Sequence, residues 1–378
     1  MYKSSYLFEG LSSPLLFQRR GRGGLSKSLL ILFFLITFAI HASASSFVKA
    51  SDEHFVYMGR ISRAIPDAVA WTYPGVQIVC RFSGSSVSMK TNPGSGFYII
   101  QIDDREPFKV ESKKGQEIIS LAKNLADGEH ELHIVYAIEG HGKKPVFYGL
   151  FLDDEAQLLD PPALPERKIE FIGNSITCGY GIEGNGKEKT FYYSLQNFCL
   201  TYAYLTAQAL QAQYHVVARS GIGVYRNYMG KIPEQIMPFV YPHTMYSTKG
   251  ELWDFSLYQP DVVCVALGTN DTTGSYTVSG LTGGFRRFVA QLRENYPTAK
   301  ILFLIGPMMS QKRRNDLKTA QQTVIDEYAA LGDNAIFSFE FQESDKALGM
   351  GSQGHPNAAH HAQMAEELIP YLRQLMEW

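Results

Sequence analysis

Apolar and polar residues alternate along the first part of the chain. Between residues 45 and 160, the clearest alternation places Val76, Ile78, Cys80 and Phe82 on one face of a segment. A period of two residues is typical of a β-strand with one buried face. Similar short runs follow at 97–102, 118–121, 131–136 and 146–152. Several short strands at close spacing predict a β-sandwich of jelly-roll type, which we assign to residues 45–160.

A different pattern begins after the stiff linker Asp160-Pro161-Pro162-Ala163-Leu164-Pro165. Continuous apolar runs then alternate with stretches of helical period, such as 285–295 and 316–331. The apolar runs lie at 169–172, 214–218, 261–267, 301–305 and 335–339. This alternation predicts right-handed βαβ units and a parallel five-stranded sheet covered on both faces. We therefore assign residues 166–378 to an α/β domain.

Three of these predicted strands end in residues that can carry chemistry. Ser175 lies in the turn after the first strand, Gly221 follows the second and Asn270 follows the third. Ligands of open parallel sheets bind at the carboxyl ends of the strands. A serine in such a turn is held rigidly with its hydroxyl exposed, as nucleophilic acyl chemistry requires. A glycine N–H group and an asparagine amide can donate to the oxyanion that forms.

A serine hydroxyl also needs a base, and His355 is the candidate among ten histidines. It follows the loop 351–354 and precedes Pro356-Asn357, where the last helix is expected to begin. Each of these segments also has an ordinary interpretation, because Gly, Asn and Ser are common in turns and a histidine is common in a solvated helix-entry turn. Their order at the edges of successive βα units favours the catalytic interpretation.

Ser175, Gly221, Asn270 and His355 stand in the order that names the SGNH, or GDSL-type, hydrolases, and the chain resembles that superfamily. Three segments resemble carbohydrate esterase family 2 in particular: 173–181, 220–227 and 364–368. The resemblance implies a flavodoxin-like hydrolase domain behind a jelly roll, and a carbohydrate O-acetylesterase of acetylxylan or glucomannan type. Ser175 is then the nucleophile and His355 the base, while the oxyanion hole is formed by Ser175, Gly221 and Asn270.

The sequence departs from the superfamily at three positions. Asn174 replaces the usual Asp of the Gly-Asp-Ser turn, and Ser352 stands where an Asp usually precedes the histidine by three residues. Some family 2 members carry an Asp two residues before the histidine, but that position here is Gln353. The group that orients His355 is therefore open between the main chain and the side chains of Ser352 and Gln353. We favour a main-chain carbonyl, because Gly351, Gly354 and Pro356 can fix the loop.

The net charge and the N-terminal segment indicate which ligands are excluded and where the protein is located. The net charge of −2 gives no electrostatic footprint for nucleic acid or acidic lipid. Residues 29–40 form an apolar run that follows several basic residues and precedes Ala42-Ser43-Ala44. This pattern predicts a signal peptide region at residues 1–44 and export to the periplasm or beyond the cell, with an uncleaved anchor as the alternative. No stable membrane insertion is expected after cleavage.

The four cysteines and the histidines show no metal-binding spacing, so we expect no metal and no cofactor. Cys80 and Cys264 lie in apolar runs and are expected to be buried thiols, while a Cys178–Cys199 disulfide stays open. The expected partner is an acetylated carbohydrate. Two alternatives remain: an esterase for other acyl esters, such as lipid or aryl esters, and a non-catalytic sugar-binding protein.

Overall fold

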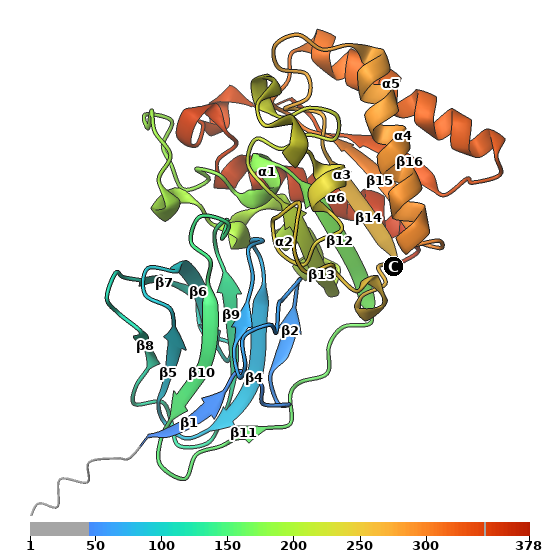
Figure 1. Ribbon diagram of the computed structural model, residues 1–378. Helices are drawn as coiled ribbons and strands as arrows, with labels where there is room; N and C mark the ends of the chain where they lie inside the picture. The colour runs from blue at the N-terminus through green and yellow to red at the C-terminus, as the bar shows by residue number, and fades with distance from the viewer. Residues whose placement is uncertain (1–44, 344) are drawn as a thin grey trace, which may run out of the picture. The chain divides into compact units, whose positions relative to one another are not determined.

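The computed structural model describes residues 45–343 and 345–378 (Figure 1). The predicted signal peptide region, 1–44, lies outside the described residues. Antiparallel sheets form the N-terminal part and a parallel sheet with helices forms the C-terminal part, so the predicted fold class is confirmed. The limits 45–160 and 166–378 stay our proposal for the domain boundaries.

The N-terminal part consists of two antiparallel sheets. One has the order β1-β10-β5-β8 with β3 on β10, and the other has the order β11-β4-β9-β6-β7 with β2 on β4. Ile78, Cys80 and Phe82 of β4 are almost fully buried, as the alternation predicts. The strands are β1 (Ser46–Lys49), β2 (Val56–Met58), β3 (Val69–Ala70), β4 (Gln77–Ser83), β5 (Val87–Thr91), β6 (Gly96–Ile102), β7 (Phe108–Ser112), β8 (Ile118–Ala122), β9 (Glu129–Tyr136), β10 (Val146–Leu152) and β11 (Leu158–Leu159).

The C-terminal part contains one parallel sheet in the order β13-β12-β14-β15-β16, which is the flavodoxin-like order 2-1-3-4-5. Its strands are nearly continuous apolar runs because helices cover both faces. The five strands are β12 (Arg167–Gly173), β13 (Ala212–Ala218), β14 (Val262–Ala266), β15 (Lys300–Ile305) and β16 (Ile336–Glu340). The helices are α1 (Ser175–Cys178), α2 (Tyr202–Ala209), α3 (Met237–Val240), α4 (Val278–Asn295), α5 (Gln311–Ala330) and α6 (Ala358–Met376).

Helix α4 begins seven residues before the segment with clear helical period, 285–295. Thr277 caps it by accepting a hydrogen bond from the Gly280 amide at 3.0 Å. Glycines are poor helix formers, but a Cβ on Gly280 or Gly284 would lie within 3 Å of the Tyr225 side chain. Glycine is therefore required at these two positions by the close packing of Tyr225, and local helix propensity alone does not predict a helix there.

The two parts share one hydrophobic cluster, which includes Tyr136 and Ile138 of the first part and Phe198 and Tyr214 of the second. Polar residues cross this junction as well. Gln77 occupies the face of β4 opposite to its sandwich core, yet it is 3% exposed, and the Tyr214 hydroxyl of the second part donates to its side chain at 3.1 Å. The alternation in β4 thus reports two buried faces, one in the sandwich and one against the parallel sheet.

A buried ion pair also joins the two parts. Arg60 donates to Glu170 of β12 at 3.1 Å, and both side chains are fully buried. The same guanidinium donates to the main-chain oxygens of Tyr241 and His243, and the Tyr241 hydroxyl donates to Glu170. Two buried charges are tolerated here because the carboxylate and the two terminal guanidinium nitrogens make further hydrogen bonds, although Arg60 Nε has no partner among the described residues.

Candidate active site

The nucleophile candidate stands in a tight turn between β12 and α1. A Cβ on Gly173 would lie 2.0 Å from the Thr177 hydroxyl oxygen, so only glycine allows this strand to turn directly into the helix. Asn174 caps α1 by accepting from the Ile176 amide at 3.1 Å, and its side-chain nitrogen donates to the Ala266 carbonyl at 3.0 Å. An aspartate could make the first bond but not the second. Asn174 therefore ties the Ser175 turn to the end of β14.

His355 lies against Ser175, with Nε2 2.9 Å from the serine Oγ. Its loop ends in a short 3₁₀ turn, η7 (Ser352–Gly354), and Asn357 then caps α6 by accepting from the His360 amide at 3.1 Å. Burial lowers the pKa of the His355 imidazole to about 4. The imidazole is therefore uncharged near neutral pH, which is the state that can accept a proton.

The other imidazole nitrogen, Nδ1, lies 3.3 Å from the main-chain oxygen of Ser352. The nearby side chains are engaged elsewhere. The Ser352 hydroxyl donates to Glu188 at 3.3 Å, while the Gln353 amide nitrogen donates to the Lys189 carbonyl at 2.8 Å. The Gln353 side-chain oxygen accepts from the Tyr180 hydroxyl. This geometry supports a main-chain orienter for His355, which stays our proposal.

Gly221 and Asn270 line the same cleft as Ser175 and His355, and the cleft has a volume of about 560 Å³. Gly221 has φ +83°, and a Cβ there would meet nothing closer than 3.8 Å, so the backbone conformation and not crowding requires glycine. The Asn270 amide nitrogen donates to the Ile222 carbonyl at 2.8 Å. One of its two hydrogens is thereby fixed, and the second is left for a ligand. The structure thus brings all four predicted residues together.

Asp271 is a residue whose part in this arrangement the sequence reasoning missed. Its buried carboxylate accepts from four main-chain amides: Val224 at 3.2 Å, Tyr225 at 2.7 Å, Arg226 at 3.0 Å and Gly268 at 3.0 Å. These amides belong to the loops after β13 and β14, which also carry Gly221 and Asn270. An acidic residue directly after Asn270 in a strand-exit turn was the available signal, because such a side chain can accept several loop amides.

A row of aromatic rings begins beside His355 with Tyr180, which lines the cleft. Tyr180 lies over the imidazole with the two ring centroids 4.4 Å apart, and Phe191 stacks on Tyr180 with their centroids 4.6 Å apart. Tyr193 follows at 4.7 Å from Phe191. These rings are partly exposed. Burial of the imidazole lowers its pKa, and Tyr180 is the ring of this row that lies against it.

Arg313 contributes a permanent charge to the lining of the cleft, and no other lining residue carries one near neutral pH. Its guanidinium donates to the Thr272 hydroxyl at 3.0 Å and to the Thr269 carbonyl at 2.6 Å. Both acceptors are neutral, and burial lowers the pKa of the guanidinium. An uncompensated cation in a cleft favours a negatively charged group on the ligand.

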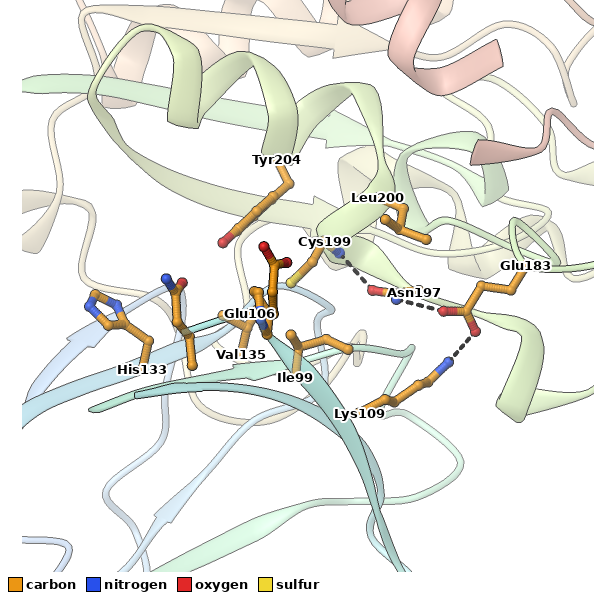
Figure 2. Close-up of a pocket in the computed structure, with 12 residues that line it drawn as sticks. Ile99, Glu106, Lys109, His133, Val135, Glu183, Asn197, Cys199, Leu200 and Tyr204 are labelled. Carbon is orange, nitrogen blue, oxygen red and sulfur yellow. Dashed lines mark hydrogen bonds and ion pairs between the residues drawn. The ribbon is translucent and has the colours of Figure 1, made fainter. Parts of the chain in front are cut away.

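A second cleft, of about 390 Å³, lies between the sheet face of β6 and β9 and the start of α2 (Figure 2). Lys109 is paired with Glu183 at 2.5 Å, and Asn197 donates to the same carboxylate at 2.7 Å. Both contacts are dashed in Figure 2. His133 also lines this cleft, but its ring contacts Gln77 and Glu131. The cleft holds none of the four predicted residues.

All four cysteines are free thiols, so the Cys178–Cys199 disulfide left open by the sequence is absent. Within residues 45–343 and 345–378, no group of three or more His, Cys, Asp or Glu side chains is arranged to hold a metal ion. In the same part of the chain, no helix combines the length and apolar character needed to cross a bilayer.

Comparison with known proteins agrees with this geometry. Residues 57–162 match the model described as "Carbohydrate esterase 2 N-terminal", and residues 171–363 match the "GDSL-like Lipase/Acylhydrolase family". The chain is 31% identical over 344 residues to an acetylxylan esterase / glucomannan deacetylase of Cellvibrio japonicus, covering 89% of this chain and 93% of that protein. The chain belongs to carbohydrate esterase family 2. The predicted family and the predicted class of carboxylic ester hydrolase are thereby confirmed.

Other relatives and solved structures are similar to this family 2 chain as well. It is 33% identical over 326 residues to the cellulase/esterase CelE of Acetivibrio thermocellus, a match that covers 85% of this chain but spans only 40% of that protein. A family two carbohydrate esterase from Clostridium thermocellum, solved in complex with cellohexaose, has a TM-score of 0.80 at 32% identity. That match covers 86% of this chain and 99% of the solved chain. A family two esterase from Cellvibrio japonicus has a TM-score of 0.80 at 29% identity, covering 89% and 99%.

Proposed function

We propose that this protein removes acetyl groups from plant polysaccharides or oligosaccharides by serine ester hydrolysis. The observation that carries the proposal is the 2.9 Å contact between His355 Nε2 and Ser175 Oγ in a cleft shared with Gly221 and Asn270. Relatives named acetylxylan esterase / glucomannan deacetylase support the substrate class. The partly exposed aromatic rings beside His355 offer faces on which sugar rings can stack.

In the first half of the reaction, Ser175 Oγ attacks the ester carbonyl carbon while His355 Nε2 takes the hydroxyl proton. The carbonyl oxygen becomes an oxyanion, which accepts from the Ser175 and Gly221 amides and the Asn270 side chain. The carbon–oxygen bond to the sugar then breaks. The sugar oxygen leaves with the proton that His355 returns, and the acetyl group stays on Ser175.

In the second half, water attacks the acetyl-serine carbonyl and gives its proton to His355. The same donors hold the second oxyanion. The bond to Ser175 Oγ breaks, His355 returns the proton to the serine, and acetate leaves. Throughout, the Ser352 carbonyl accepts from His355 Nδ1 and so fixes the tautomer in which Nε2 faces Ser175.

The test compares acetate release from acetylated xylan and acetylated glucomannan with hydrolysis of an aryl acetate and an aryl octanoate. We expect acetyl esters to be favoured and Ser175→Ala to lose more than about 100-fold in rate, since removing a nucleophile costs far more than that. Ser279→Ala, at an exposed serine of α4, is the matched control and should behave as the unchanged protein. Equal or better turnover of octanoate would favour an esterase for longer acyl chains, and no turnover of any ester would favour a sugar-binding protein.

We also propose that the protein is exported, acting in the periplasm or outside the cell. The support is the apolar run at residues 29–40 with basic residues before it and Ala42-Ser43-Ala44 after it. Acetylated polysaccharides are large and are most accessible to an exported enzyme. Amino-terminal sequencing of the protein made in its host would test cleavage after residue 44.

A further inference from the structure

A carboxylate from the β part reaches the catalytic end of the parallel sheet. Glu139, three residues after β9, is only 3% exposed. Its Oε1 accepts from the Ser220 amide at 2.6 Å, and its Oε2 accepts from the Ser220 hydroxyl at 2.5 Å. Ser220 directly precedes Gly221, the oxyanion donor that follows β13. The two parts of the chain therefore meet at the residue before a catalytic amide.

Glu139 also reaches the loop system of the nucleophile. The Gln196 side-chain nitrogen lies 3.4 Å from Glu139 Oε2 and donates to the Cys178 carbonyl at 3.0 Å. Cys178 is the last residue of α1, the helix that begins with Ser175. Gln196 is fully buried, so water does not compete for these bonds. One carboxylate thus connects the turn that carries the nucleophile with the turn that carries Gly221.

The cost of this arrangement points to a role beyond packing. None of the ion pairs among the described residues includes Glu139. Burying a carboxylate is expensive, and this one is compensated by short hydrogen bonds from N–H and O–H donors, while the charge of Arg219 acts on the same neighbours, Cys178 and His141, from further away. Ser220 is held at its amide and at its side chain together, which restrains the residue whose carbonyl carbon is bonded to the Gly221 nitrogen.

We propose that Glu139 is a positioning residue for the oxyanion hole. This inference rests on the proposed ester hydrolysis, since it concerns the Gly221 amide in that reaction. Glu139 does not touch the substrate and acts through Ser220 and Gln196. On this reading the β part contributes a side chain to the catalytic centre of the parallel-sheet part.

The experiment measures kcat and KM for an aryl acetate with Glu139→Ala, Glu139→Gln and Ser220→Ala. Glu139→Ala should lower kcat by roughly 10- to 100-fold with little change in KM, because charge-assisted hydrogen bonds that place a donor affect the transition state most. Glu139→Gln should lose less, since one oxygen remains for the Ser220 amide. The double variant Glu139→Ala/Ser220→Ala should lose less than the product of the two single losses, because both act through one contact.

Tyr214→Phe is the matched control. It removes the hydroxyl that donates to Gln77, so it deletes another polar contact across the same junction, on the same strand β13 but far from its catalytic end. We expect this variant to keep the kcat of the unchanged protein. Each variant is assayed below its own melting temperature, and binding of an arylboronic acid, which forms a tetrahedral adduct with the serine, should weaken in parallel with kcat.

The outcomes separate this inference from the proposed function. If the unchanged protein hydrolyses the aryl acetate and folded Glu139→Ala keeps kcat within about threefold of Tyr214→Phe, the positioning role is wrong. The role is also wrong if the folded variant changes only KM. Should Glu139→Ala fail to fold, Glu139→Gln and Ser220→Ala decide, and additive losses in their double variant would overturn the proposal. Absence of activity in the unchanged protein would instead overturn the proposed function.

Discussion

The lowered pKa of His355 makes a quantitative prediction about activity in acid. The base must be neutral to accept the Ser175 proton, so kcat/KM falls as pH drops through the imidazole pKa of the free enzyme. With a pKa of about 4, about nine tenths of the imidazole is still neutral at pH 5. An imidazole at the usual value of about 6.5 would be only about 3% neutral at that pH. The two cases differ by a factor of about 30 in kcat/KM at pH 5.

The neighbour of His355 whose removal tests this prediction is Tyr180. The Tyr180 ring lies over the imidazole at a centroid distance of 4.4 Å and keeps water from it. Tyr180→Ala should hydrate the imidazole and move the acid limb of the profile upward from about pH 4 toward 6.5, whatever it does to substrate binding. Tyr192→Ala is the control, because Tyr192 is an exposed tyrosine, 53% accessible, in the same segment as Phe191. Its acid limb should stay in place.

The assay is acetate release at low substrate concentration between pH 4 and 8, with circular dichroism at each pH. The folded protein must be checked because His355 and His361 both have lowered pKa values, to about 4 and about 3. The unfolded chain binds more protons than the folded one below about pH 6.5, so stability falls as pH drops from there toward those values. A midpoint of the wild-type limb near 6.5 in folded protein would refute the desolvation argument.

Four further predictions follow from single contacts. Asn270→Ala should lower kcat by roughly 10²–10³ with a smaller change in KM, and an effect on KM alone would mean that the amide binds ground-state substrate. Gln353→Ala and Ser352→Ala should each keep most aryl acetate activity. A fall of either variant to the activity of Ser175→Ala would mean that a side chain orients the imidazole. Arg60→Met should cost about 3–5 kcal/mol of unfolding free energy in denaturant titration, because it leaves its carboxylate partner buried and unpaired. Arg313→Gln should lower kcat/KM for an aryl hemisuccinate about tenfold more than kcat/KM for an aryl acetate at low salt, whereas equal losses on both esters would indicate a purely structural arginine.

The pattern of apolar residues determined the architecture of this chain. Period-two runs gave the antiparallel strands, and continuous runs between helical stretches gave the five parallel strands, each within two residues of its observed limits. The apolar pattern of a strand is a local property of the sequence, and the carboxyl ends of parallel strands meet at one edge of the sheet, where ligands bind. The sequence alone therefore predicts that Ser175, Gly221 and Asn270 lie at the same edge of the parallel sheet.

Two features depended on contacts between residues far apart in the sequence, and a third depended on the conformation of a loop. The start of α4 is decided by Tyr225 packing on two glycines, and Gln77 is buried at the junction where the Tyr214 hydroxyl donates to it. The group nearest to His355 Nδ1 that we propose as its orienter is a main-chain oxygen, which every residue carries and no sequence pattern can mark.

The electrostatic environment of the site residues likewise depends on the tertiary structure. The sequence identified His355 as a base but not its lowered pKa, because desolvation depends on which rings surround the imidazole. It placed Glu139 in a β-rich segment with no sign of a partner 81 residues away. The sequence by itself determined which residues could perform the chemistry, since residue type and strand order are local properties. Only the folded chain decided how those residues are oriented and charged, since both depend on neighbours that the chain brings together from distant positions.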